Sequence, residues 1–136
     1  APPAQLRLVV VHQPVAVPER SDARDLLRGH AHAVRDWAAA GADVILGGHI
    51  HLPFVQPLHE THPLAPGRRL WCVQAGTAVS SRVRPPAGNS VNVLRRHFDG
   101  VERALLVERW DHVAARARFE RVASDVLPLG KAPSDG

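Results

Sequence analysis

Two histidines stand close together at the end of a short apolar run in residues 43–53. The run reads DVILGGHIHLP, so two glycines precede His49 and His51, which have one residue between them. Side chains alternate along an extended chain, and these two rings point the same way if the strand continues, while the glycines let the backbone turn. Neutral imidazole is a ligand for zinc, iron, manganese and nickel. The spacing therefore predicts a metal site that holds one ion or bridges two.

The elements around this stretch predict that a third histidine joins it. Residues 5–11 form a β-branched run that predicts a strand buried on both faces and ending at His12. Residues 22–40 carry apolar side chains at helical spacing, with Ser21 or Asp22 as N-cap and Gly41 as the stop. Residues 43–46 predict a second strand.

A strand, helix, strand unit is normally parallel and right-handed, and ligands bind where its strands end. His12 and the loop with His49 and His51 are therefore expected at one edge of the sheet. Taken alone, His12 is better explained as a residue that caps its strand and bonds a nearby carbonyl. The convergence of three histidines favours a site.

The other histidines that we considered have less favourable settings. His30 and His32 are two residues apart on the predicted helix, so their side chains diverge by about 200° and are interpreted as helix-surface residues. His59 and His62 flank Glu60 in a segment rich in proline and glycine, which indicates a surface hairpin loop more than a metal site.

The next segments predict an edge strand, a buried strand and a loop that suits an anion. Prolines confine the strand at 53–58 to an edge or to its ends, and a strand at 69–74 follows. The small residues of the loop at 75–82 bring backbone N–H groups close to an anion, and Arg82 and Arg84 can reach phosphate oxygens. The alternative is a solvated turn.

The second half of the chain predicts an antiparallel meander. Strands are expected at 90–94, 101–111 and 114–122, with Asp99-Gly100 as the hairpin turn between the first two. We assign 1–123 to one domain and 124–136 to a mobile tail.

Composition limits the functional classes. A chain of 136 residues that is 45% hydrophobic suits one domain with an ordinary core. The net charge of +4 invites nucleic acid, but the basic residues are scattered, so a dedicated nucleic-acid surface is disfavoured. Cys72 is the only cysteine and lies in a predicted buried strand, which favours an inert thiol and a reducing cytoplasm. No run reaches the roughly 18 apolar residues of a membrane span.

Three motifs in this order resemble the C-terminal half of a calcineurin-like metallophosphoesterase. Residues 9–14, VVVHQP, resemble a strand that ends in a metal-binding histidine followed closely by proline. Residues 48–51, GHIH, resemble the Gly-His-x-His signature of the family, and residues 75–82 with 89–92 resemble the loop and strand that follow it. The resemblance extends over about residues 5–110.

This resemblance implies a four-layer α/β/β/α sandwich with a mixed sheet and a dinuclear metal site. His12 and His49 would bind one divalent ion and His51 the other, the ions being manganese, iron, zinc or nickel. The implied activity is that of a hydrolase acting on phosphomonoesters or phosphodiesters, with Arg82 and Arg84 as candidate contacts to the substrate.

The motifs that would complete such a site are not found in the sequence. The family's N-terminal motifs are Asp-x-His, Gly-Asp-x-x-Asp and Gly-Asn-His followed by Asp or Glu. Here Asp111 and His112 are adjacent, and Gly88-Asn89 is followed by serine. We therefore expect a fragment, a truncated form or one chain of a pair, inactive alone, with the catalytic histidine in a missing N-terminal half that acts in cis or in trans.

Two further interpretations stay open. A noncatalytic module that binds protein or nucleic acid would explain the missing carboxylates. Half of a sandwich would also leave a sheet edge or face unpaired, which predicts self-association.

Overall fold

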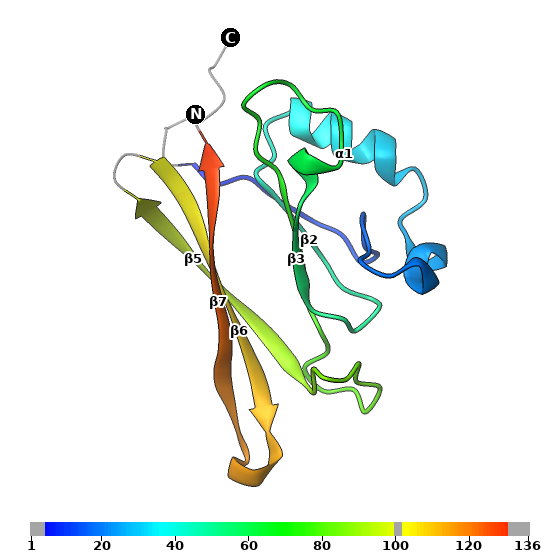
Figure 1. The fold of residues 1–136 in the computed structure, drawn as a ribbon, viewed down its shortest axis with the longest axis vertical. Coiled ribbons are helices and arrows are strands. Elements are labelled where there is room, and N and C mark those ends of the chain that lie inside the picture. Colours follow the sequence, from blue (N-terminus) through cyan, green and yellow to red (C-terminus); the bar gives the residue numbers. More distant parts are fainter. Residues whose placement is uncertain (1–4, 100–101, 131–136) are drawn as a thin grey trace.

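The computed structural model describes residues 5–99 and 102–130, which form two β-sheets with helices on one side. Helical segments lie between some of the strands of the first sheet, and the three strands of the second sheet are consecutive strands of the chain (Figure 1). The elements, in chain order, are β1 (Leu8–Val10), η1 (Arg20–Asp25), α1 (His30–Ala39), β2 (Val44–Gly47), β3 (Phe54–Pro57), η2 (Leu58–Glu60), β4 (Trp71–Gln74), β5 (Ser90–Asp99), β6 (Glu102–Val113), η3 (Ala114–Arg116) and β7 (Arg118–Gly130).

The first sheet is mixed and has the strand order β1-β2-β4-β3. β1 pairs in parallel with β2, and β2 in parallel with β4, so the predicted parallel strand, helix, strand unit is confirmed. β3 pairs with β4 antiparallel and lies at the edge of the sheet, as its prolines predict.

The second sheet is the predicted antiparallel meander, with the order β5-β6-β7. Its strands are longer than expected, and β7 continues to Gly130. The prediction of a mobile tail from Ser124 is therefore wrong for 124–130, because Leu127 and Leu129 alternate along β7 and are buried. Gly100 of the predicted hairpin turn and residues 131–136 lie outside the described residues.

The single helix predicted for 22–40 is interrupted. Leu26 leaves η1 with an extended ψ of 142°, and Gly29 enters α1 with a left-handed φ of 78°. The N–H of Leu27 donates to the carbonyl of Pro14 at 2.8 Å. The prediction overlooked this break because apolar periodicity continues across it. Two expected contacts are confirmed, since Val34 and Ala38 of α1 are buried.

β1 corrects another expectation, since we predicted a strand buried on both faces. Leu8 is 41% exposed and Val10 is 74% exposed, whereas Val9 packs into the cluster under α1. β1 is an edge strand, and Leu8 and Val10 project on the side away from Val9. A run of apolar residues looks the same in the sequence whether the strand is central or lies at an edge with only one face covered, so the pattern did not distinguish the two.

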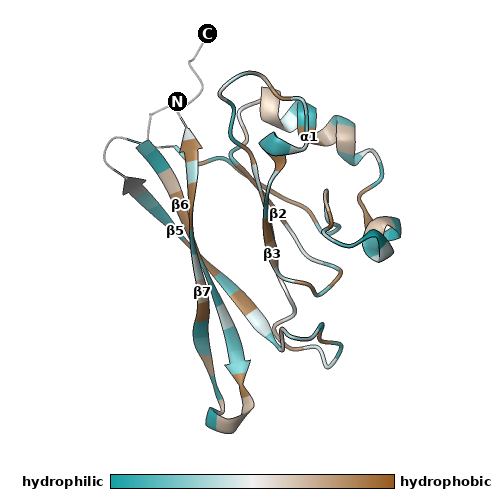
Figure 2. Cartoon of the chain, viewed as in Figure 1, coloured by the Kyte–Doolittle hydropathy of each residue, from teal (hydrophilic) through white to brown (hydrophobic). Residues whose placement is uncertain are grey.

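The described residues form three layers: α1, the mixed sheet and the antiparallel sheet (Figure 1). One apolar cluster lies between α1 and the mixed sheet, and a second lies between the two sheets. Apolar colour runs along the middle of β3 and β7 in Figure 2. A second helical layer is not formed by the described part of the chain. The buried residues of the first cluster are Val15, Val34, Ala38, Ala42, Ile45, Leu58, Leu70 and Cys72. Those of the second are Val44, Val73, Leu105, Val107, Leu127 and Leu129.

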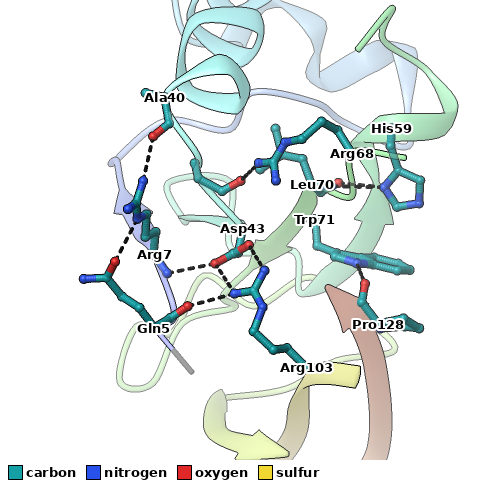
Figure 3. Close-up of polar contacts among 11 residues, drawn as sticks. Gln5, Arg7, Ala40, Asp43, His59, Arg68, Leu70, Trp71, Arg103 and Pro128 are labelled. Carbon is teal, nitrogen blue, oxygen red and sulfur yellow. Dashed lines mark hydrogen bonds and ion pairs between the residues drawn. The ribbon is translucent and has the colours of Figure 1, made fainter. Parts of the chain in front are cut away.

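A buried ion pair and an indole hydrogen bond join the two sheets (Figure 3). Arg103 of β6 donates from its two terminal nitrogens to Asp43, at 3.2 and 3.1 Å, and also to the carbonyl of Gln5 at 2.8 Å. Trp71 of β4 donates from Nε1 to the carbonyl of Pro128 in β7 at 2.8 Å. These contacts hold β4 and the start of β2 against the second sheet.

Cys72 lies inside the first cluster, as predicted. Its burial raises the pKa of the thiol to about 12, so the thiolate that reacts with electrophiles and metals is disfavoured at neutral pH.

None of the helices within 5–99 and 102–130 has the length and apolar character needed to cross a membrane.

Candidate functional site

The ends of β1 and β2 bring two of the predicted histidines into direct contact. Nε2 of His12 lies 2.9 Å from Nδ1 of His49, and the ring centroids are 4.7 Å apart. Each histidine follows its strand by two residues, and the parallel register of β1 and β2 aligns the two ends. The expected convergence at one sheet edge is therefore confirmed for this pair.

Asp25, the last residue of η1, extends this contact into a chain of three side chains. Its Oδ1 lies 3.2 Å from Nε2 of His49. One arrangement of protons satisfies both contacts: Nε2–H of His49 donates to the carboxylate, and Nδ1 of His49 accepts from Nε2–H of His12. The His49 and Asp25 side chains are 36% and 32% exposed, so solvent screens their attraction. The contact orients the ring more than it stabilises the fold.

His51 is held by a different partner. Its Nδ1 lies 2.7 Å from the carbonyl oxygen of Arg82. A carbonyl only accepts hydrogen bonds, so Nδ1 carries the proton and Nε2 is left with its lone pair. Among the described residues, no group of three or more His, Cys, Asp or Glu side chains is arranged to hold a metal ion. The structure thus does not join His51 to His12 and His49 as a third ligand.

The loop at 48–53, between β2 and β3, carries His49 and His51 and is called the histidine loop below; its backbone is unusual. His49 and His51 have left-handed φ values of 70° and 60°. This conformation costs about 1–2 kcal/mol for a residue with a Cβ. β2 ends at Gly47, so the strand does not continue through the histidines as the alternation argument assumed. The N–H of Ile50 donates to the carbonyl of Gly48 at 2.8 Å, and the N–H of Gly48 donates to the carbonyl of His12 at 3.0 Å.

The glycines before the histidines provide space. A Cβ on Gly47 would lie 2.0 Å from Oε1 of Gln74, whose side chain packs directly over the glycine. Gln74 is 1% exposed and donates from Nε2 to the carbonyl of Gly48 at 3.3 Å. Gly47 is therefore needed so that the buried amide of Gln74 can approach the loop. The glycines were expected to let the backbone turn, and the left-handed φ values of this turn belong to the two histidines.

Arg84, predicted to contact substrate, donates to protein groups. Its two terminal nitrogens each lie 3.1 Å from an oxygen of Asp22, and Nη1 lies 3.2 Å from the carbonyl of Ile50. Glu19 is 3.4 Å from Nη2. The hydrogen bonds with Asp22 raise the pKa of Arg84 further above its ordinary value. Arg84 thus ties η1 to the peptide group between His49 and His51.

Arg82, the other predicted substrate contact, has an exposed side chain. Within the described ranges its guanidinium makes no hydrogen bond or ion pair, although its carbonyl accepts from His51. Arg82 is therefore the better placed of the two arginines to contact an anion.

The two facing nitrogens of His12 and His49 fit part of a metal site. Two ligands that are each about 2.1 Å from one ion lie about 3.0 Å apart at a right angle, as in octahedral coordination, and about 3.4 Å apart at the tetrahedral angle. The observed 2.9 Å, which is also a hydrogen-bond distance, is closer to the first spacing, and the carboxylate on the far nitrogen of His49 is the usual partner of a metal-binding imidazole. The donors are neutral, however, and no bridging carboxylate joins them in the described part of the chain. The residues fit two ligands of one ion.

In the described part of the chain, the remaining histidines named above make no hydrogen bond or ring contact with His12, His49 or His51. His30 has a buried Nδ1 with no hydrogen-bond partner among the described residues, and His32 lies 2.8 Å from Arg35. Nδ1 of His59 lies against the backbone of Leu70, and His62 contacts the hydroxyl of its neighbouring threonine at 3.0 Å.

Sequence reasoning missed the contributions of Asp22 and Asp25. Both were placed in the first turns of a continuous helix over 22–40, where an acidic residue merely suits the helix N-terminus. Because the helix is broken after η1, these carboxylates have other partners: Asp25 contacts His49, and Asp22 contacts Arg84. The only available signal was two aspartates three residues apart, soon after the strand that ends at His12.

Comparisons of the chain with protein-family models, with curated proteins and with solved structures each gave no match.

Proposed function

We propose that this chain carries the histidine part of a dinuclear metallophosphoesterase site, within a four-layer calcineurin-like α/β/β/α domain that residues outside this chain complete. The observation that carries the proposal is the 2.9 Å approach of His12 Nε2 and His49 Nδ1 at the ends of two parallel strands. The order of the VVVHQP and GHIH motifs adds to it. The proposed activity is metal-dependent hydrolysis of phosphomonoesters or phosphodiesters.

In the proton arrangement described above, Nδ1 of His49 and Nε2 of His51 have lone pairs, whereas Nε2 of His12 would have to lose the proton that it donates to His49 before it could bind an ion. His12 and His49 would hold one ion through Nε2 and Nδ1, and His51 would hold the second through Nε2, because its Nδ1–H is bonded to a carbonyl. Bound divalent ions of manganese, iron, zinc or nickel supply Lewis-acid polarisation of a phosphoryl oxygen and activation of water. Arg82 would contact a phosphate oxygen, and Arg84 would hold the loop.

The proposal needs bridging carboxylates and a catalytic histidine from a further segment or chain. β1 offers a place for that partner, because its outer edge is unpaired in the described sheet and Leu8 and Val10 are exposed beside it. A strand added at this edge would satisfy backbone N–H and C=O groups and cover apolar side chains.

Metal binding by the chain tests the proposal directly. Titration with cobalt(II), followed by its visible absorption, is expected to show binding that His12→Ala and His49→Ala abolish. His62→Ala is the matched control, because His62 is paired with a neighbouring hydroxyl away from the two strand ends, and it should bind like wild type. Equal loss in the control, or binding unaffected by His12→Ala and His49→Ala, would contradict the site.

Hydrolysis of bis(p-nitrophenyl) phosphate with manganese is expected to stay at background for this chain alone, because the carboxylates are missing. Brisk turnover that His51→Ala abolishes would show that the chain is a complete enzyme. The proposal of a partial site would then be wrong.

Exposed apolar strands favour self-association as a second function, independent of catalysis. Val10 is 74% exposed on β1, and Val122 and Val126 are 50% and 49% exposed on β7. β1 and β7 are both edge strands, which are sites of strand pairing between chains. Light scattering should show mass rising with concentration, and a strict monomer at high concentration would exclude this function.

A nucleic-acid role receives less support from the arginines. Within residues 5–99 and 102–130, at least seven of them donate to acidic side chains, which reduces the charge available to phosphates. They are Arg84, Arg95, Arg103, Arg109, Arg116, Arg118 and Arg121.

A further inference from the structure

Two acidic side chains link η1 to the histidine loop, one by direct contact and one through Arg84. The carboxylate of Asp25 lies 3.2 Å from Nε2 of His49. Asp22 acts at one remove, since it binds both terminal nitrogens of Arg84, which in turn donates to the carbonyl of Ile50. One contact holds the imidazole ring, and the other holds the peptide group that follows it. Together they restrain a loop whose left-handed residues would relax if it were free.

The end of η1 is also fixed to the loop that carries the other histidine. Nε2 of Gln13 donates to the carbonyl of Asp25 at 3.2 Å, and the N–H of Leu27 donates to the carbonyl of Pro14 at 2.8 Å. Gln13 and Pro14 directly follow His12. The backbone of Asp25 is therefore held by the His12 loop while its side chain contacts His49.

We propose that Asp25 is a positioning residue for His49. Its carboxylate holds the ring as the Nε2–H tautomer and leaves the lone pair of Nδ1 facing His12, so the ligand nitrogen of His49 is oriented before a metal ion binds. The expected effect of Asp25 on metal affinity rests on the proposed function. The contact between Asp25 and His49, by contrast, exists in the metal-free protein and can be tested there.

The chemistry of imidazole gives this contact its expected effect. A neutral ring has one N–H, and a carboxylate accepting from that N–H fixes the tautomer, the ring orientation and the basicity of the opposite nitrogen. Loss of such a partner typically weakens metal binding by about 10- to 100-fold. Asn at position 25 keeps an oxygen that accepts the N–H and loses the charge, whereas Ala removes both.

The test without metal follows the ring nitrogens of His49 by long-range ¹⁵N–¹H NMR. In wild type, Nε2 is expected at the shift of a protonated nitrogen and Nδ1 at that of an unprotonated one. Asp25→Ala should move the two shifts toward each other, and Asp25→Asn should largely restore the wild-type pattern. Asp36→Asn, which removes an exposed carboxylate from α1, is the control and should change neither shift.

The test with metal is a zinc titration of the same four proteins by calorimetry. Asp25→Ala should weaken zinc binding by about 10- to 100-fold, Asp25→Asn by less, and Asp36→Asn not at all. A wild-type His49 protonated on Nδ1, or an Asp25→Ala variant with unchanged shifts, would overturn the positioning role. If wild type binds no zinc, the proposed function fails, and the NMR comparison still decides the role of Asp25.

Discussion

Two aspartate–arginine pairs in this molecule have nearly the same geometry and different surroundings. Arg103 meets Asp43 at 3.1 and 3.2 Å, and Arg84 meets Asp22 at 3.1 Å for both contacts. The side chains of the first pair are 9% and 1% exposed, whereas those of the second are 32% and 10% exposed. The same fork-to-fork contact therefore acts once in the interior and once near solvent.

The difference in burial indicates what each pair does. Asp43 directly precedes β2 and Arg103 lies in β6, so their contact joins the two sheets. Asp43 also accepts a hydrogen bond from the N–H of Arg7. Removing one member would leave a buried charge without its partner. The Arg84 pair joins a loop to η1, where water can replace a lost contact. The first pair should determine stability, and the second the shape of the histidine loop.

The largest change in the free energy of unfolding is expected from Arg103→Met. It leaves the carboxylate of Asp43 buried without its guanidinium, which should lower the free energy of unfolding by about 3–5 kcal/mol. Urea denaturation followed by circular dichroism measures this change.

The double variant Asp43→Asn with Arg103→Met is the control for this prediction. Because the uncompensated charge is then removed, the double variant should be less destabilised than the sum of the single variants. Strictly additive losses would show that the two side chains are not energetically coupled.

A smaller change in stability is expected from Arg84→Lys, which keeps the charge and loses the planar fork. The free energy of unfolding should fall by about 1 kcal/mol or less. The NMR shifts of His49 and His51 should nevertheless change, because the carbonyl of Ile50 between them loses its donor.

Arg109→Lys is the matched control for Arg84→Lys. Arg109 forms a similar pair with Asp111, with side chains 31% and 13% exposed, and makes no described contact with the histidine loop. Arg109→Lys should lower the free energy of unfolding by a similar amount and leave the NMR shifts of His49 and His51 unchanged. Equal perturbation of these signals by the two variants would remove the special role of Arg84.

Local patterns predicted much of the fold. Runs of β-branched residues located the parallel strands, and their parallel pairing predicted that His12 and His49 would meet. The meander followed from alternation and turn residues. These features depend on neighbours in the sequence or on general rules of strand connection.

Contacts between distant residues were beyond this reasoning. The pairing of Asp22 with Arg84 depends on where η1 breaks, and periodicity does not reveal this because a leucine pair spans the break. The burial of Leu127 and Leu129 depends on the opposing sheet. Likewise, the left-handed backbone of His49 depends on contacts that hold the loop, whereas propensity assigns such angles to glycine.

The smallest effect on stability is expected from a third ionic contact, on the second sheet, where the buried Glu108 accepts from two exposed arginines, Arg121 at 2.9 Å and Arg95 at 3.2 Å. Hydrogen bonds from Arg121, then Arg95, lower the pKa of Glu108 below its ordinary value. The pKa of a glutamate in the unfolded chain is about 4.3. The contacts of Glu108 therefore stabilise the fold above that pH, and this stabilisation is lost as the pH falls through the lower pKa of the folded state. Wild type should therefore lose more Tm than Glu108→Gln between pH 7 and pH 3. Glu60→Gln, at an exposed site, should behave like wild type. The side chains of Arg95 and Arg121 are 62% and 57% exposed. If Tm falls equally in wild type and Glu108→Gln between pH 7 and pH 3, the contacts of Glu108 with these arginines contribute nothing measurable to stability.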